Sequence, residues 1–206
     1  MSYKKFFVIL ISLILLTLSV NAEENPSIKG IYTQLPEFKF VFDGKKVEVI
    51  EFFSFYCSHC YEFEKSIPVI KGNFPKKIQW KSVPVYWGKG SSKPSEAYFL
   101  AEDEGKGEQM KKALFDALFI EKRDISDISV LESIGAKLEL GFDFSRRLRA
   151  GEKEKEANAA LIMMEAYSVE GTPALIIAGN IKVVSGPTHD ALKDNTITIL
   201  NSILKK

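Results

Sequence analysis

The segment at 47–55 constrains the fold more than any other part of the chain. Its second half is apolar on both alternations, which is typical of a central strand covered on both faces. The segment leads into the chain's only two cysteines, Cys57 and Cys60. The spacing of apolar residues after Cys57 favours a helix, with a kink or an early end at Pro68. The sequence therefore predicts a dithiol at the start of a helix that follows a buried strand.

The rest of the chain predicts an α/β fold built on one mixed sheet. Four further segments rich in Val, Ile and Phe are expected to be strands, the last two forming a hairpin: 38–41, 78–86, 174–178 and 181–184. Pro84 favours an edge position or a late break in its strand. Between 94 and 167 the spacing favours three or four helices, and a final helix is expected over 188–204.

The N-terminus has the pattern of a signal peptide. Lys4 and Lys5 precede an apolar run at 6–20, and small residues then lead to a cleavage site after Ala22. The run is about 15 residues, shorter than the roughly 20 that a membrane-spanning helix needs, although an uncleaved anchor remains the alternative. We expect residues 1–22 to be removed on export.

The two cysteines are better explained by reactivity than by structure. Exported proteins keep disulfides, but a bridge that closes so small a loop removes little entropy from the unfolded chain. A zinc site is the alternative, and it normally needs four ligands, for which His189 is the other candidate besides the motif. We therefore expect a redox-active pair and no metal.

The position of the pair favours a reactive thiolate. Free N–H groups and the dipole at a helix N-terminus stabilise negative charge on Cys57. His59, between the two thiols, is expected to lower the pKa of Cys57 further by a positive charge or a hydrogen bond. We expect Cys57 to be the sulfur that exchanges with substrate and Cys60 to be the resolving thiol.

Two motifs now carry a resemblance to a known family. The segment at 51–61 resembles the active-site segment of the DsbA family of thiol:disulfide oxidoreductases, and 171–174 resembles that family's cis-proline loop. The resemblance implies a thioredoxin-like fold with an all-helical insertion. It also implies a cis peptide bond before Pro173, with the backbone of Thr172 beside the disulfide and open to an extended substrate chain.

The family likeness also implies domain limits. The thioredoxin-like domain is expected at 23–93 and 168–206, and the helical insertion at 94–167. Glu51, in the central strand, would need a buried partner, for which Lys81 in the next strand is the candidate. In the family such a pair lies near the dithiol, where the carboxylate is able to help move the proton of Cys60.

The implied function is a periplasmic oxidase that introduces disulfides into reduced or unfolded exported proteins. It would need no cofactor beyond its own Cys57–Cys60 disulfide, would be re-oxidised by a DsbB-like membrane quinone reductase, and is expected to be a monomer. The balance of 28 basic and 27 acidic residues, interspersed along the chain, argues against nucleic-acid binding.

A reductase on the same fold is the main alternative. Ser58 and Thr172 depart from the best-known family members, which have proline and a bulkier apolar residue there, and both positions touch the disulfide. An isomerase would need a dimerisation segment, and only about 15 residues lie between Glu23 and the first expected strand, too few for an independent domain. A binding protein with an inert disulfide is disfavoured by His59, which serves reactivity rather than packing.

Overall fold

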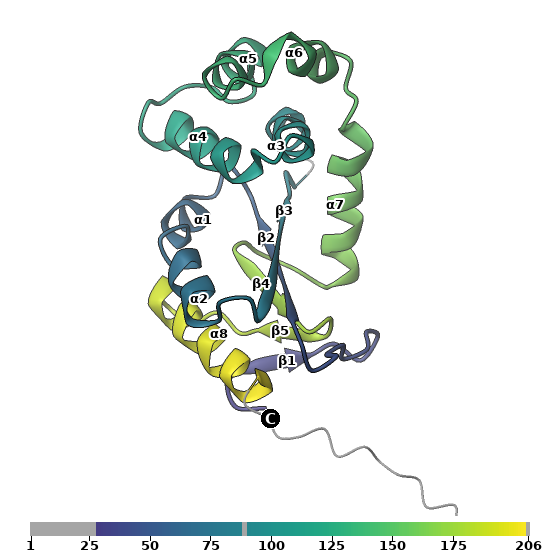
Figure 1. Cartoon of the computed structure of the whole chain (residues 1–206), viewed down its shortest axis with the longest axis vertical. Coiled ribbons are helices and arrows are strands. Elements are labelled where there is room, and N and C mark those ends of the chain that lie inside the picture. Colours follow the sequence, from purple (N-terminus) through teal and green to yellow (C-terminus); the bar gives the residue numbers. More distant parts are fainter. Residues whose placement is uncertain (1–27, 88–89, 205–206) are drawn as a thin grey trace, which may run out of the picture.

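A five-stranded mixed sheet forms the centre of the molecule (Figure 1). The computed structural model describes residues 28–87 and 90–204, so the expected signal peptide lies outside the described residues. The strand order is β1-β5-β4-β2-β3, with bounds Tyr32–Gln34 (β1), Val47–Phe53 (β2), Ile78–Pro84 (β3), Ala174–Ile177 (β4) and Ile181–Val183 (β5). Strand β2 runs parallel to β3 and antiparallel to β4, so it is central as expected.

Helices cover both faces of the sheet and one end of it (Figure 1). One face carries α1 (Ser58–Phe63), α2 (Ile67–Asn73) and α8 (His189–Leu204), and the other carries α7 (Glu154–Ala166). Four helices cap the end at which β2 stops: α3 (Lys93–Asp103), α4 (Gly107–Phe119), α5 (Ile128–Lys137) and α6 (Gly141–Arg149). No helix within the described ranges is long and apolar enough to cross a bilayer.

The alternation of side chains along β2 explains this arrangement. Val47 and Val49 pack with residues of α2 and α8, whereas Ile50 and Phe52 pack with residues of α7. Phe53 belongs to a third cluster, built mainly from α3 to α6. The α/β class with a helical insertion is confirmed, but residues 93–166 form five helices instead of three or four.

The expectation of a strand at 38–41 is wrong. The edge beside β5 is taken by β1, which pairs with it antiparallel. Residues 38–41 instead cross the β4–β5 turn, where the Val41 N–H donates to the Ala178 carbonyl oxygen at 2.9 Å. Phe38 stacks on Tyr167, with ring centroids 4.1 Å apart. The apolar residues that suggested a strand therefore cover the end of the hairpin.

Both prolines named above mark ends of elements. Strand β3 is an edge strand and ends at Pro84, as expected. After Cys57 the chain makes two short helices, and the break at 64–66 comes before Pro68. Pro68 lies in the first turn of α2, where its missing N–H leaves no hydrogen bond unmade. The early end of the first helix was therefore predicted correctly, but its position was not.

Candidate active site

The end of β2 places Cys57 at the N-cap of α1. Its backbone is extended, and its Sγ accepts a hydrogen bond from the Cys60 N–H at 3.3 Å. Ser58 follows as the first residue of the helix and is exposed. Cys57 is half-buried, whereas Cys60 is fully buried in the core cluster that the end of β2 shares with the capping helices. One thiol of the pair is therefore accessible and the other is not.

The two cysteines differ sharply in acidity. A hydrogen bond from the Cys60 thiol is the largest of several that lower the pKa of Cys57 to about 5, against the opposing effect of burial. The Thr172 side chain and the backbone N–H groups of Cys60 and His59 add to this lowering. Burial raises the pKa of Cys60 far above the usual range of a thiol. At neutral pH Cys57 is a thiolate and Cys60 a thiol, which is the state suited to exchange through Cys57.

The loop before β4 lies against the dithiol. Its Thr172–Pro173 peptide bond is cis, and the Thr172 carbonyl oxygen is 3.3 Å from Cys57 Sγ. These residues are separated by 115 positions in the sequence. The structure thus places Thr172 beside Cys57, before a cis proline, as the family resemblance implied.

The His59 side chain does not act as expected. Its Nδ1 lies 3.3 Å from Nε2 of His189, at the start of α8, and His189 Nδ1 lies 3.2 Å from Oε2 of Glu62. His59 lowers the pKa of Cys57 through its backbone N–H. The contact of the His59 imidazole with a histidine of a second helix could not be predicted from the motif alone.

Glu51 has a different buried partner from the one predicted. Its carboxylate is fully buried and accepts hydrogen bonds from Lys111 Nζ at 2.8 and 3.0 Å. Lys81 is exposed, because alternation along β3 turns it to the opposite face. Its neighbours Trp80 and Ser82 are the β3 residues that donate to Glu51, at 3.0 and 2.8 Å.

Lys111 also binds a second carboxylate. Its Nζ lies 2.7 Å from Glu64 Oε1 and 4.1 Å from the centre of the Phe53 ring. Burial lowers the pKa of Lys111, but Glu51 and Glu64 outweigh that effect and raise it. Lys111 was not among the residues predicted from the sequence. The available signal was a lysine within the buried, apolar face of the helix at 107–119.

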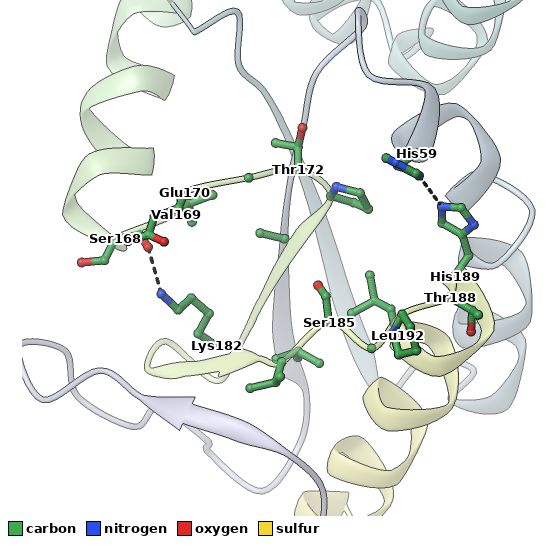
Figure 2. Close-up of a pocket in the computed structure, with 17 residues that line it drawn as sticks. His59, Ser168, Val169, Glu170, Thr172, Lys182, Ser185, Thr188, His189 and Leu192 are labelled. Atoms are coloured by element: carbon green, nitrogen blue, oxygen red, sulfur yellow. Dashed lines mark hydrogen bonds between the residues drawn. The ribbon is translucent and has the colours of Figure 1, made fainter.

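A groove runs beside the dithiol on the side of β4, β5 and α8 (Figure 2). Its volume is about 660 Å³. Figure 2 shows His59 and His189 facing each other at one side and Thr172 above the strands. Apolar side chains form much of the lining, including Pro173, Val184, Pro187 and Leu192. The space is therefore suited to a chain with apolar side chains.

Sequence comparisons point to one family. The family model described as a DSBA-like thioredoxin domain matches residues 83–195, which include the Thr172–Pro173 loop but not the dithiol. A thiol:disulfide interchange protein DsbA from Haemophilus influenzae is 30% identical over 172 residues, covering 79% of this chain and 82% of that protein. The protein of the same name from Burkholderia cepacia is 26% identical over 167 residues, covering 78% and 76%.

Solved structures agree with the fold. The oxidoreductase DsbA from Xylella fastidiosa superposes with a TM-score of 0.73 at 21% identity, covering 87% of this chain and all of that one. A DsbA from Proteus mirabilis, solved with a non-covalently bound peptide, gives 0.68 at 21% identity and covers 87% and 98%. The predicted thioredoxin-like fold with a helical insertion is thereby confirmed.

Proposed function

Because the chain belongs to the family of DSBA-like thioredoxin domains, we propose that it is a periplasmic oxidase that introduces disulfide bonds into exported proteins. The chain is a thiol:disulfide oxidoreductase, as its relatives are. The observation that carries the proposed direction is the contrast between Cys57, with a pKa lowered to about 5, and the protonated, buried Cys60. A stabilised thiolate in the reduced form makes the corresponding disulfide a stronger oxidant.

The proposed reaction is a pair of thiol–disulfide exchanges without a cofactor. A substrate thiolate attacks Cys57 Sγ of the Cys57–Cys60 disulfide, and the sulfur of Cys60 leaves and takes up a proton. A second thiolate of the substrate then attacks the substrate sulfur that is bonded to Cys57. The substrate disulfide forms, the mixed disulfide breaks, and Cys57 leaves as a thiolate. The substrate loses two electrons and the enzyme gains them. A DsbB-like membrane quinone reductase would accept these electrons and restore the disulfide.

Two structural features support the proposed recognition of substrate. The Thr172 backbone lies beside Cys57, where it is suited to pair with an extended chain, and the groove continues from it. The Proteus mirabilis relative binds a peptide without a covalent bond. Glu51 pairs with Lys111 instead of Lys81. We propose that this buried pair positions the elements around the dithiol and that its carboxylate helps to move the proton of Cys60 during exchange.

The proposed organisation follows the same family. Residues 23–93 and 168–206 would form the thioredoxin-like domain, 94–167 the helical insertion, and 1–22 a cleaved signal peptide. Helix α7 supports a close junction between the two units, since Ala160 and Met164 pack on the sheet residues Ile50 and Phe52. Fractionation of cells that express the untagged chain should place a shortened protein in the periplasm. That protein is expected to be a monomer.

The redox equilibrium of the Cys57–Cys60 pair tests the direction of transfer. The pair is equilibrated with a series of glutathione buffers and its state is read by thiol alkylation. A potential well above about −270 mV, the value of thioredoxin, supports the oxidase. A potential near or below that value would assign the chain to the reductases, which is the second candidate function.

The roles of the two cysteines are tested by trapping. Cys60→Ser should accumulate mixed disulfides with reduced protein substrates, because the thiol that resolves them is missing. Cys57→Ser should form none, although it keeps one thiol. Adducts in Cys57→Ser instead of Cys60→Ser would reverse the assignment.

A further inference from the structure

The two histidines of the chain meet beside the dithiol but outside its hydrogen bonds. His59 and Glu62 lie three residues apart on α1, so they project from the same face of the helix. His189 reaches them from the first turn of α8. In Figure 2 the rings of His59 and His189 face each other across a dashed line. All three side chains are at least partly accessible to solvent.

The geometry of these side chains matches that of metal ligands. The two facing imidazole nitrogens are 3.3 Å apart. Two nitrogen ligands of a tetrahedral zinc ion, each bound at roughly 2.0–2.1 Å, are separated by about 3.4 Å. One donor atom from each of the three residues can be chosen so that all lie within 4.8 Å of one another. To bind the same ion, the Glu62 carboxylate would move toward the two facing nitrogens.

The surroundings of His189 favour the same interpretation. His189 Nε2 faces His59 Nδ1, and its Nδ1 lies 3.2 Å from Glu62 Oε2. The carboxylate is therefore already beside the two imidazoles that would share an ion. Imidazole and carboxylate ligands suit Zn²⁺ and similar divalent transition metals. Two histidines, one glutamate and solvent make up a donor set found in open zinc sites.

We propose that His59, His189 and Glu62 bind one divalent transition-metal ion, with Zn²⁺ as its representative. The ion takes the place of the proton shared by the two imidazoles, and solvent completes its coordination. It would connect α1 to α8 and hold the His59 side chain away from Cys57. The site is separate from the thiols and does not depend on the direction of disulfide exchange.

The test uses an untagged protein in which the dithiol cannot bind zinc. Cys57→Ser/Cys60→Ser is titrated with Zn²⁺ by calorimetry, because thiolates are zinc ligands in their own right. We expect one saturable site. Adding His189→Ala should abolish it, and adding Glu62→Gln should weaken it roughly 10-fold or more. Adding Glu165→Gln, an exposed glutamate on α7, should leave it unchanged.

A second measurement assigns the ligands directly. Because the chain has two histidines, its imidazole NMR spectrum contains two side chains, and both should shift together with one equivalent of Zn²⁺. The spectrum also reports whether the variants are folded. The proposal is wrong if zinc binds only when the cysteines are present, if no saturable binding occurs, or if His189→Ala leaves the affinity unchanged.

Discussion

At the scale of single residues, two cysteines three positions apart are held in opposite protonation states. Cys57 is half-buried at the N-cap of α1, where hydrogen bonds converge on its sulfur, while Cys60 is fully buried in the hydrophobic core. The Cys60 thiol itself donates the hydrogen bond that lowers the pKa of Cys57 most. Each cysteine therefore sets the state of the other, and removing one should change the chemistry of the one that remains.

This dependence predicts the pH profile of Cys57 alkylation. In Cys60→Ser, whose hydroxyl is still able to donate, the rate with iodoacetamide should be half-maximal near the lowered pKa of about 5. In Cys60→Ala the midpoint should move to higher pH, because the donor is gone. Equal midpoints in the two variants would show that the backbone donors suffice. A midpoint close to the ordinary thiol value of 9.0 in both would contradict the stabilised thiolate.

At the scale of elements, one lysine connects three segments around the dithiol. Lys111 on α4 contacts Glu51 on β2 and Glu64 after α1, and it is 1% exposed. A buried ion pair is not by itself a strong source of stability, because desolvation offsets much of the attraction. Removing Lys111 alone is nevertheless expected to be costly, because Glu51 and Glu64 would be left without their cation.

Lys111→Met should therefore destabilise the protein. We expect a loss of about 3–5 kcal/mol in the free energy of unfolding, the usual effect of leaving a buried charge unpaired. Lys112→Met is the matched control: its side chain is 76% exposed and pairs with Asp116, so its effect should stay within about 0.5 kcal/mol. Urea unfolding measures both. Similar small losses for the two variants would mean that Lys111 is not a structural connection.

Packing between α5 and α6 gives a second prediction at this scale. A Cβ at Gly135 would overlap the ring of Phe144, so Gly135→Ala should cost about 1–3 kcal/mol through overpacking. At Gly72, in α2, nothing lies within 4 Å of the added carbon. Gly72→Ala should be neutral or stabilise the helix by up to about 1 kcal/mol. Thermal unfolding should therefore show a lower melting temperature for Gly135→Ala and an unchanged or higher one for Gly72→Ala. A Gly135→Ala variant as stable as the unchanged protein would contradict the packing.

At the scale of the whole molecule, the redox state and the stability of the fold are linked. A disulfide that readily oxidises others belongs to a protein whose reduced form is the more stable one. The proposed oxidase thus predicts that the reduced protein unfolds at higher denaturant concentration than the oxidised protein. The reverse order would favour the reductase.

The difference between the two forms should also depend on pH. The folded pKa of Cys57 is about 5, below the ordinary value of 9.0. The stability that ionised Cys57 contributes to the folded, reduced protein is therefore complete above pH 9 and is lost as the pH falls toward 5. Cys60, whose pKa is raised, changes stability only above pH 9. The stability of the reduced form relative to the oxidised form should rise from pH 5 to 9, as measured by denaturant unfolding of both forms, and a flat difference would exclude a stabilised thiolate.

Features that belong to a single element or a single motif could be predicted from the sequence. The buried strand before Cys57, the helix after it, the β4–β5 hairpin and the Thr172–Pro173 loop were predicted from local pattern and family likeness. Such patterns repeat within a few residues, so the order of amino acids suffices to show them.

Apart from the contact between Cys57 and the Thr172–Pro173 loop, which the family likeness implied, contacts between distant elements could not be predicted from the sequence. Lys111 replaces Lys81 because α4, not β3, presents a cation to the face of β2 that carries Glu51. His59 turns to His189, 130 residues away, and β1 takes the sheet edge from residues 38–41. In each case several residues had suitable chemistry. The choice among them depends on how helices and strands pack, and no pattern within one segment contains that information.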